Sequence, residues 1–366
     1  MSTPFYADHA ALPGDLKRAN QQHVLSVLRS GRTMTAPQIH EETGISRPTV
    51  MRALQHYCEK GVVESLGLGS TTSLGGKKPE LFRFADRERF LCAHVSSESI
   101  TLALSGMLGD VYAVEQIHAR TGKTADEVAA TLAENVPAYL KKQDVSAEEL
   151  FGVVLTTNGK ADAALEEKLK DLFGAKVFLI QNAGKAAGRA MMMQDPAYAG
   201  MRLLTLSTSA SGVSACLLDR GRDLLAGDIG HMAISDRGPV CSCGRRGCFE
   251  SLISAQNARQ LMQGLQVNGL RDLFQQAASG ESTAKGALRY LAGCFASVIH
   301  NVSLCFALDA VVIQGDYAQA GAAFDKMLRD ALGQETEVVY ERQSLSVLAV
   351  QGAAENMKER YFEMAD

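Results

Sequence analysis

The stretch GHMAISDRGPVCSCGRRGCFE, from Gly230 to Glu250, places one histidine and three cysteines in a short, glycine-rich loop. Three thiolates and one imidazole form the donor set of a tetrahedral zinc ion, and the residues are His231, Cys241, Cys243 and Cys248. Four protein ligands leave no coordination position for water, so we expect one structural Zn²⁺ per chain. Two alternatives stay open: reduced thiols beside an unrelated histidine, and another thiophilic ion.

The composition is that of a soluble globular protein large enough for two or three domains. The chain has 366 residues, of which 46% are hydrophobic and 21% charged. The N-terminus lacks a secretory signal pattern, and no apolar run reaches the roughly 20 residues that span a bilayer. Most of the eight cysteines stand singly in apolar stretches, which is typical of reduced core thiols. We therefore expect a cytoplasmic protein.

Residues 1–88 have the pattern of a winged helix-turn-helix domain. Helical spacing of apolar residues over 14–31 precedes a second helix that begins after Thr35 and ends at Gly44. Ser46 is expected to cap a third helix, which ends at Gly61. VVESLGL (62–68) and ELFRF (80–84) then read as two strands joined by a basic, glycine-containing wing.

The third helix presents side chains suited to DNA. Its outward face and the wing carry the donors that contact phosphates and base edges, and these predicted DNA-binding residues are Ser46, Arg47, Thr49, Arg52, Gln55, Lys77 and Lys78. The first 90 residues also hold 12 lysines and arginines against 9 acidic residues, although the whole chain has a net charge of −4. A basic N-terminal domain on an acidic body favours a polyanionic partner. The alternative is a helix-turn-helix that contacts only proteins.

The remaining residues alternate strands and helices, which indicates an α/β body with sheet cores. Strand-like runs near 90–115 and 201–219 each suggest the start of one lobe of a duplicated, two-lobed arrangement. We expect a small lobe over 89–182 together with about 353–366, and a large lobe over 183–352 that holds the metal loop and an oligomerisation surface.

The sequence resembles the ROK family, the repressors, open reading frames and kinases of sugar metabolism. The resemblance rests on three parts of the sequence: the segment GDIGHM followed by CSCGRRGCFE, the winged-helix region including its wing segment GGKKP, and the later segments LDAVVIQGD and VQGAAENMKER. It implies a two-lobed body of actin-like, ribonuclease H-like fold. It also implies a sugar-type effector site, whose candidate residues are Asn182, Asp228, His231 and Glu250. The alternative for Asp228 and Glu250 is that they only orient groups around the zinc loop.

The chain departs from the pattern of that family in four places, the first three of which concern the kinase branch. The kinases have an Asn-Asp pair in which the aspartate is the general base, but here Ala183 follows Asn182. The first strand is followed by HVSSES where the kinases have an aspartate and glycines, and the second phosphate loop, STSASGV, keeps only Gly212. A fourth departure is the short stretch 161–178, where relatives contribute a sugar contact. We expect no enzymatic activity.

The sequence thus predicts a DNA-binding transcriptional regulator, a repressor of sugar-related genes. Its body would form a homodimer, or a dimer of dimers, on a pseudo-palindromic operator. Two other hypotheses are a ROK sugar kinase, disfavoured by Ala183, and a regulator controlled by a partner protein without a small-molecule ligand.

Overall fold

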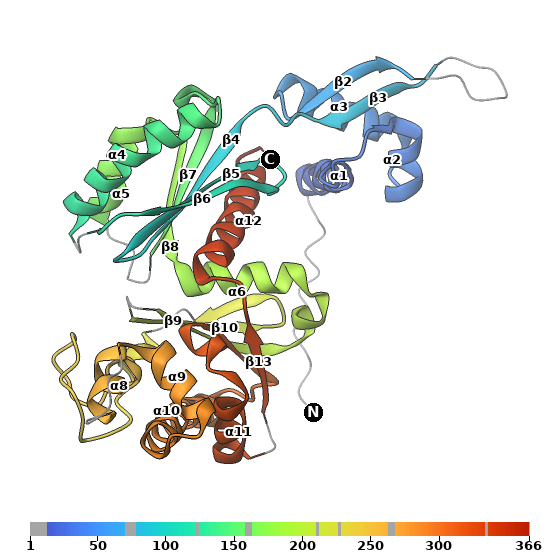
Figure 1. The fold of residues 1–366 in the computed structure, drawn as a ribbon. Helices are drawn as coiled ribbons and strands as arrows, with labels where there is room; N and C mark the ends of the chain where they lie inside the picture. Colours follow the sequence, from blue (N-terminus) through green and yellow to red (C-terminus); the bar gives the residue numbers. More distant parts are fainter. Residues whose placement is uncertain are drawn as a thin grey trace, which may run out of the picture. The chain divides into compact units, whose positions relative to one another are not determined.

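The computed structural model describes residues 13–69, 78–121, 124–157, 163–209, 212–225, 228–262, 268–333 and 336–365 (Figure 1). The chain divides into two compact units. The first comprises Met1–Arg89, Gly106–Leu108 and Lys358–Asp366, and the second comprises Phe90–Ser105 and Gly109–Met357. In the described part of the chain, no helix is both long and apolar enough to cross a membrane.

The first unit is a winged helix-turn-helix with a three-stranded sheet of order β1-β3-β2. Its elements are α1 (Pro13–Leu28), β1 (Met34–Thr35), α2 (Ala36–Thr43), α3 (Arg47–Glu59), β2 (Val63–Leu68) and β3 (Glu80–Phe84). Thr35 caps α2 in a capping box, and Gly44 ends it in the left-handed conformation. The predicted order of helices and strands is confirmed, and the short strand β1 is an addition to it.

The core of this unit also contains two residues from the last helix, Tyr361 and Phe362. Val24, Leu25, Ile39, Val50 and Leu54 are all fully buried on the inner faces of the three helices. The last helix of the chain, α12 (Leu345–Ala365), adds two aromatic side chains near its end.

These aromatic side chains pack on the wing strand β3. Phe362 lies 5.2 Å from the ring of Phe84, and Tyr361 lies 6.2 Å from the same ring. The guanidinium of Arg29 stands 3.7 Å from the centre of the Phe362 ring, which is cation–π geometry. The last turn of α12 is therefore part of the winged-helix core.

The second unit contains two five-stranded sheets with the same topology, in the orders β6-β5-β4-β7-β8 and β11-β10-β9-β12-β13. In the second sheet β9, β10 and β11 pair antiparallel, whereas β12 and β13 add parallel. In the first sheet β6 likewise pairs antiparallel with β5, and β8 pairs parallel with β7. This repetition confirms the duplicated α/β body.

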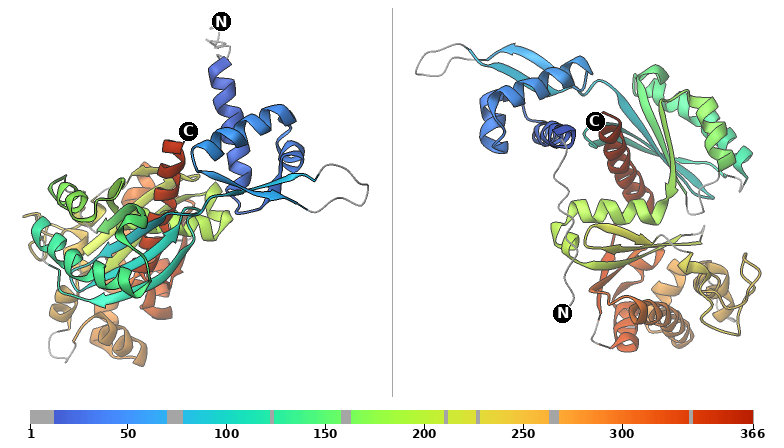
Figure 2. Two further views of the ribbon diagram at one scale, coloured as in Figure 1. Left: turned by 90° about the horizontal axis from the view of Figure 1, so that it is seen from above. Right: turned by 180° about the vertical axis from the view of Figure 1, so that it is seen from behind.

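The first lobe consists of β4 (Arg89–Val95), β5 (Ser99–Gly106), β6 (Val111–His118), α4 (Ala125–Lys142), η1 (Ala147–Glu149), β7 (Leu150–Thr157), α5 (Ala163–Phe173) and β8 (Val177–Asn182). Helices α4 and α5 lie side by side on one face of the sheet (Figures 1 and 2) and bury their apolar stripes against it.

The second lobe consists of α6 (Ala183–Gln194), η2 (Pro196–Gly200), β9 (Arg202–Ser209), β10 (Gly212–Asp219), β11 (Arg222–Leu225), η3 (Ile229–His231), α7 (Phe249–Ile253), α8 (Ala255–Leu261), α9 (Leu270–Ser279), α10 (Ser282–Cys305), β12 (Ala310–Gly315), η4 (Asp316–Gln319), α11 (Gly321–Leu332) and β13 (Glu337–Glu341). One face of its sheet packs on helices α7 to α11. The other face packs on α6, which in turn contacts the early part of α12.

The single cysteines are only partly as expected. Cys92, Cys216 and Cys294 are buried core thiols, but Cys305 is exposed and Cys58 is half-buried. Cys305 is the last residue of α10, where the helix runs out of the core.

Candidate metal centre, cleft and nucleic-acid interface

The four predicted metal ligands lie together in the second lobe. His231 ends η3, Cys241 and Cys243 lie in the following loop, and Cys248 directly precedes α7. One ligand atom from each residue lies within 4.8 Å of all the others. The Sγ atoms of Cys243 and Cys248 are 3.6 Å apart. Zn–S bonds of about 2.3 Å at tetrahedral angles separate two sulfurs by roughly 3.8 Å, so the arrangement fits a zinc ion.

The loop has little apolar content to hold it in shape. Bridges join Ala233 to Cys248 and Val240 to Arg246. Gly247 has φ +64°, and a Cβ there would lie 2.0 Å from the backbone oxygen of Ser235, so only glycine fits. A metal that joins both ends of such a loop supplies the cohesion that side-chain packing does not.

The thiols differ in how readily they lose a proton. The pKa of Cys243 is lowered to about 6 by the backbone N–H of Arg245 and then by the Arg245 side chain. Burial raises the pKa of Cys248 to about 12, and hydrogen bonding with its neighbouring thiols adds to this. A thiol binds metal as thiolate, so a cation with strong affinity for sulfur is needed to deprotonate Cys248.

Glu250, in the first turn of α7, lies directly against this cluster. Its Oε1 is 3.4 Å from Nδ1 of His231 and 3.3 Å from Sγ of Cys241. The other oxygen faces two glycines, because a Cβ built on Gly212 or Gly230 would lie 2.9 Å or 3.1 Å from it. Of the candidate effector residues, the structure thus brings Glu250 and His231 into contact.

The other two candidates lie at neighbouring elements. Asn182 caps α6 by accepting a hydrogen bond from the backbone N–H of Lys185, at 3.1 Å. Asp228 is exposed and precedes η3. Both α6 and η3 pack against β10. Ala183, which follows Asn182, is fully buried in an apolar cluster with Ala186 and Ala349.

Two carboxylates stand near the ends of the core strands β4 and β12. Asp316 directly follows β12, and Glu98 lies in the turn between β4 and β5. The pKa of Asp316 is raised, first by burial and then by the negative charge of Glu98.

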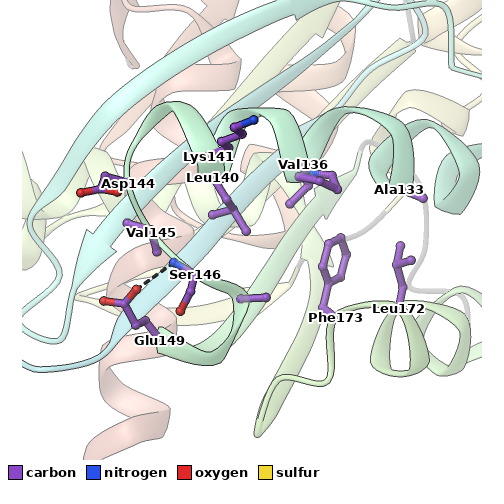
Figure 3. A pocket seen from close by; sticks show the side chains of 12 residues that line it. Ala133, Val136, Leu140, Lys141, Asp144, Val145, Ser146, Glu149, Leu172 and Phe173 are labelled. Carbon is purple, nitrogen blue, oxygen red and sulfur yellow. Dashed lines mark hydrogen bonds between the residues drawn. The ribbon is translucent and has the colours of Figure 1, made fainter.

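A separate pocket of about 550 Å³ lies in the first lobe, between α4 and the end of α5 (Figure 3). Val136, Leu140, Val145 and Phe173 form its apolar part, while Ser146 and Glu149 are joined at its edge by a hydrogen bond from the backbone N–H to the carboxylate. None of the candidate effector residues lines this pocket. No motif in the sequence indicates this pocket.

Three of the side chains that are predicted to contact DNA lie on the exposed face of α3. Arg47, Arg52 and Gln55 are exposed, opposite a buried face formed by Val50, Ala53, Leu54 and Tyr57. Ser46 precedes the helix as expected, although its side chain does not cap it: its hydroxyl pairs instead with that of half-buried Thr49, at 2.9 Å. Lys78 is exposed, and Lys77 lies outside the described residues.

Two features of this unit were missed from the sequence. Met51 is 42% exposed on α3, between the predicted DNA-contacting residues. Arg83 and Arg87 both form ion pairs with Glu64, and these bonds lower the pKa of its carboxyl. The two arginines are therefore engaged within the winged helix.

Comparison with known proteins identifies the family. The model of the ROK family matches residues 91–359, which is most of the chain. The chain belongs to the ROK family. Among curated ROK relatives, N-acetylmannosamine kinase of Vibrio cholerae is 27% identical over 176 residues, which are 47% of this chain and 61% of the kinase. The xylose repressor of Bacillus spizizenii is 23% identical over 280 residues, 71% of each chain.

A solved structure extends the likeness to the winged helix. A ROK family transcriptional regulator, described as a homologue of the Escherichia coli MLC protein, superposes with a TM-score of 0.74 at 16% identity and covers 96% of this chain. At that identity the likeness establishes the fold: a winged helix-turn-helix followed by a ROK body.

Proposed function

We propose that this ROK protein is a DNA-binding transcriptional regulator, a cytoplasmic repressor of sugar-related genes. The observation that carries the proposal is α3, which presents Arg47, Arg52 and Gln55 to solvent on a helix-turn-helix. Arginine matches guanine and glutamine matches adenine in the major groove. The resemblance to the xylose repressor and to the ROK regulator supports the same assignment.

In this proposal the body forms a homodimer, which places two recognition helices in successive major grooves of a pseudo-palindromic operator. A sugar-type effector at Asn182, Asp228, His231 and Glu250 would favour a spacing of the two helices that fits DNA less well. Such coupling amounts to about 1–3 kcal/mol in known cases. His231, Cys241, Cys243 and Cys248 would hold a zinc ion that stabilises the loop and has no part in catalysis.

Two features argue against phosphoryl transfer. Ala183 cannot accept the proton of a sugar hydroxyl, and its burial against Ala349 leaves no space there for another base. The two candidate phosphate loops also lack the glycines whose backbone N–H groups would hold phosphates, since HVSSES has none and STSASGV keeps only Gly212. The kinase alternative predicts that the protein consumes ATP in the presence of N-acetylmannosamine, glucose or xylose. If a coupled assay detects such turnover, the proposal that the protein has no enzymatic activity is refuted.

The DNA-binding proposal is tested by selecting an operator from random duplex DNA with the full-length protein. Arg47→Ala and Arg52→Ala are each expected to weaken binding by about 5- to 150-fold, the value of one specific arginine contact. Arg271→Ala, which removes an exposed arginine from α9 of the body, is the matched control and should leave affinity unchanged. Failure to enrich any sequence, or unchanged affinity in both α3 variants, would refute the proposal.

The effector proposal is tested by thermal unfolding with a panel of sugars and sugar phosphates. A ligand at 100 times its Kd stabilises the folded state by about 2.7 kcal/mol. Glu250→Gln should abolish the shift for the ligand that binds. Absence of any shift would favour control by a partner protein instead.

A further inference from the structure

Met51 occupies a distinctive position on the recognition helix α3. Its side chain is 42% exposed, whereas Val50 and Leu54 on the inner face are fully buried. Arg47 lies four residues before it and Gln55 four residues after it, and both are exposed. Residues four apart lie on the same side of a helix with Cβ atoms about 5–6 Å from each other. Met51 thus interrupts a line of polar side chains with an apolar one.

The chemistry of the major groove contains one feature that polar side chains do not read. Arginine recognises the acceptors of guanine, and glutamine pairs with the donor and acceptor of adenine. Thymine alone adds an apolar group, its C5 methyl, and apolar side chains contact it. The thioether side chain of methionine is flexible and polarisable, so it adapts to such a small target.

We propose that Met51 is a specificity-determining residue that selects thymine by packing against its C5 methyl group. This assignment rests on the proposed DNA-binding function of α3. Base pairs are stacked 3.4 Å apart, so two side chains about 5–6 Å apart reach base pairs no more than two steps apart. The thymine read by Met51 therefore lies within two steps of the base pair read by Gln55.

The bond between Gln55 and Glu59 sharpens this assignment. The Gln55 amide donates to the Glu59 carboxylate at 3.3 Å, so Gln55 has to exchange this partner before it reads adenine. The Met51 side chain has no hydrogen bond to give up. The contribution of Met51 to DNA affinity should therefore depend on the thymine methyl group and not on Gln55.

The experiment replaces single thymines of the selected operator by deoxyuridine, which removes only the methyl group. Affinity is measured by fluorescence anisotropy for the natural full-length protein, Met51→Ala and Gln55→Ala. Met193→Ala is the matched control, because Met193 is a similarly exposed methionine, 47%, on α6 of the body. Thermal unfolding verifies that each variant is folded.

The natural protein is expected to lose about fourfold in affinity at one thymine per half-site, equal to ~0.8 kcal/mol for one buried methyl group. Met51→Ala should bind more weakly and lose this sensitivity, while Gln55→Ala and Met193→Ala keep it. If the natural protein is insensitive at every thymine, or Met51→Ala remains sensitive, the thymine assignment is overturned although DNA binding stands. If no operator is enriched at all, the DNA-binding function itself fails, and the assignment with it.

Discussion

Replacing Cys243 by serine tests the metal centre with the least disturbance to packing. Cys243 is exposed, whereas Cys241 and Cys248 are buried, so the change removes a ligand without opening a cavity. Cys305 is exposed as well and lies outside the four-residue cluster. Cys305→Ser is therefore the matched control, because it makes the same change at an exposed cysteine outside the cluster.

The expected loss of folding stability in Cys243→Ser follows from the structure of the loop. Between Met232 and Cys248, only Cys241, Gly247 and Cys248 are buried, so few apolar contacts hold the loop when the metal is lost. Changes to groups that merely support a metal ligand cost about 10–100-fold in affinity, and loss of a ligand itself should cost at least about 100-fold. At a free zinc concentration 100 times the natural Kd, zinc stabilises the natural protein by about 2.7 kcal/mol and the variant by about 0.4 kcal/mol, so about 2.3 kcal/mol of stabilisation is lost.

That loss is measurable as a change in melting temperature. For a body of this size, 1 kcal/mol shifts Tm by about 2–4 °C, so Cys243→Ser should lower Tm by about 5–9 °C. Cys305→Ser should change stability by no more than about 0.5 kcal/mol. Circular dichroism gives Tm with and without a chelator, and elemental analysis gives the zinc content, which we expect to be one per chain for the natural protein and the control. The reasoning is refuted if Cys243→Ser retains one zinc and the natural Tm, or if the natural protein takes up no zinc.

Two further predictions concern stability elsewhere in the chain. Phe362→Ala removes a ring that is 2% exposed and packs on Phe84 and Arg29, so it should destabilise the winged helix by about 3–5 kcal/mol. Amide hydrogen exchange should then accelerate in α1 and α3. Unchanged exchange rates in these helices would contradict the packing role of Phe362. His94 is buried beside Thr156, and burial lowers its pKa to about 4. Because an unfolded histidine titrates near 6.5, the unfolded state binds more protons between about pH 6.5 and 4, and stability is lost as pH falls through that window. Between pH 7 and pH 4.5, the free energy of unfolding of His94→Gln should therefore fall by about 2–3 kcal/mol less than that of the natural protein, as measured by urea unfolding. An equal fall in both proteins would show that His94 does not cause the effect.

The winged helix was predictable because its signals are local. Thr35 and Gly44 are a helix start and a helix stop that act within a few residues, and the structure confirms both. The spacing of apolar residues likewise predicted α3, because the residues on its buried face recur with the period of a helix. The side-chain bond that Ser46 forms was not predictable, because it depends on the rotamers of two hydroxyl groups.

The clustering of the candidate metal ligands was predictable for a different reason. His231, Cys241, Cys243 and Cys248 lie within a short loop, so few residues separate them and the chain can bring them together without help from distant elements. The contact of Glu250 with His231 depends on how α7 turns after Cys248, which no local pattern encodes. The sequence therefore indicated both residues as candidates but could not indicate that they touch.

By itself the sequence determined the order of the elements, the gathering of one histidine and three cysteines in one loop, and the alanine that follows Asn182, since each is written in neighbouring residues. The tertiary structure decided that Ala183 packs against Ala349 and that Phe362 belongs to the winged-helix core. These contacts join residues more than 150 positions apart. Their partners are chosen by packing complementarity, which is a property of two surfaces and not of either segment alone.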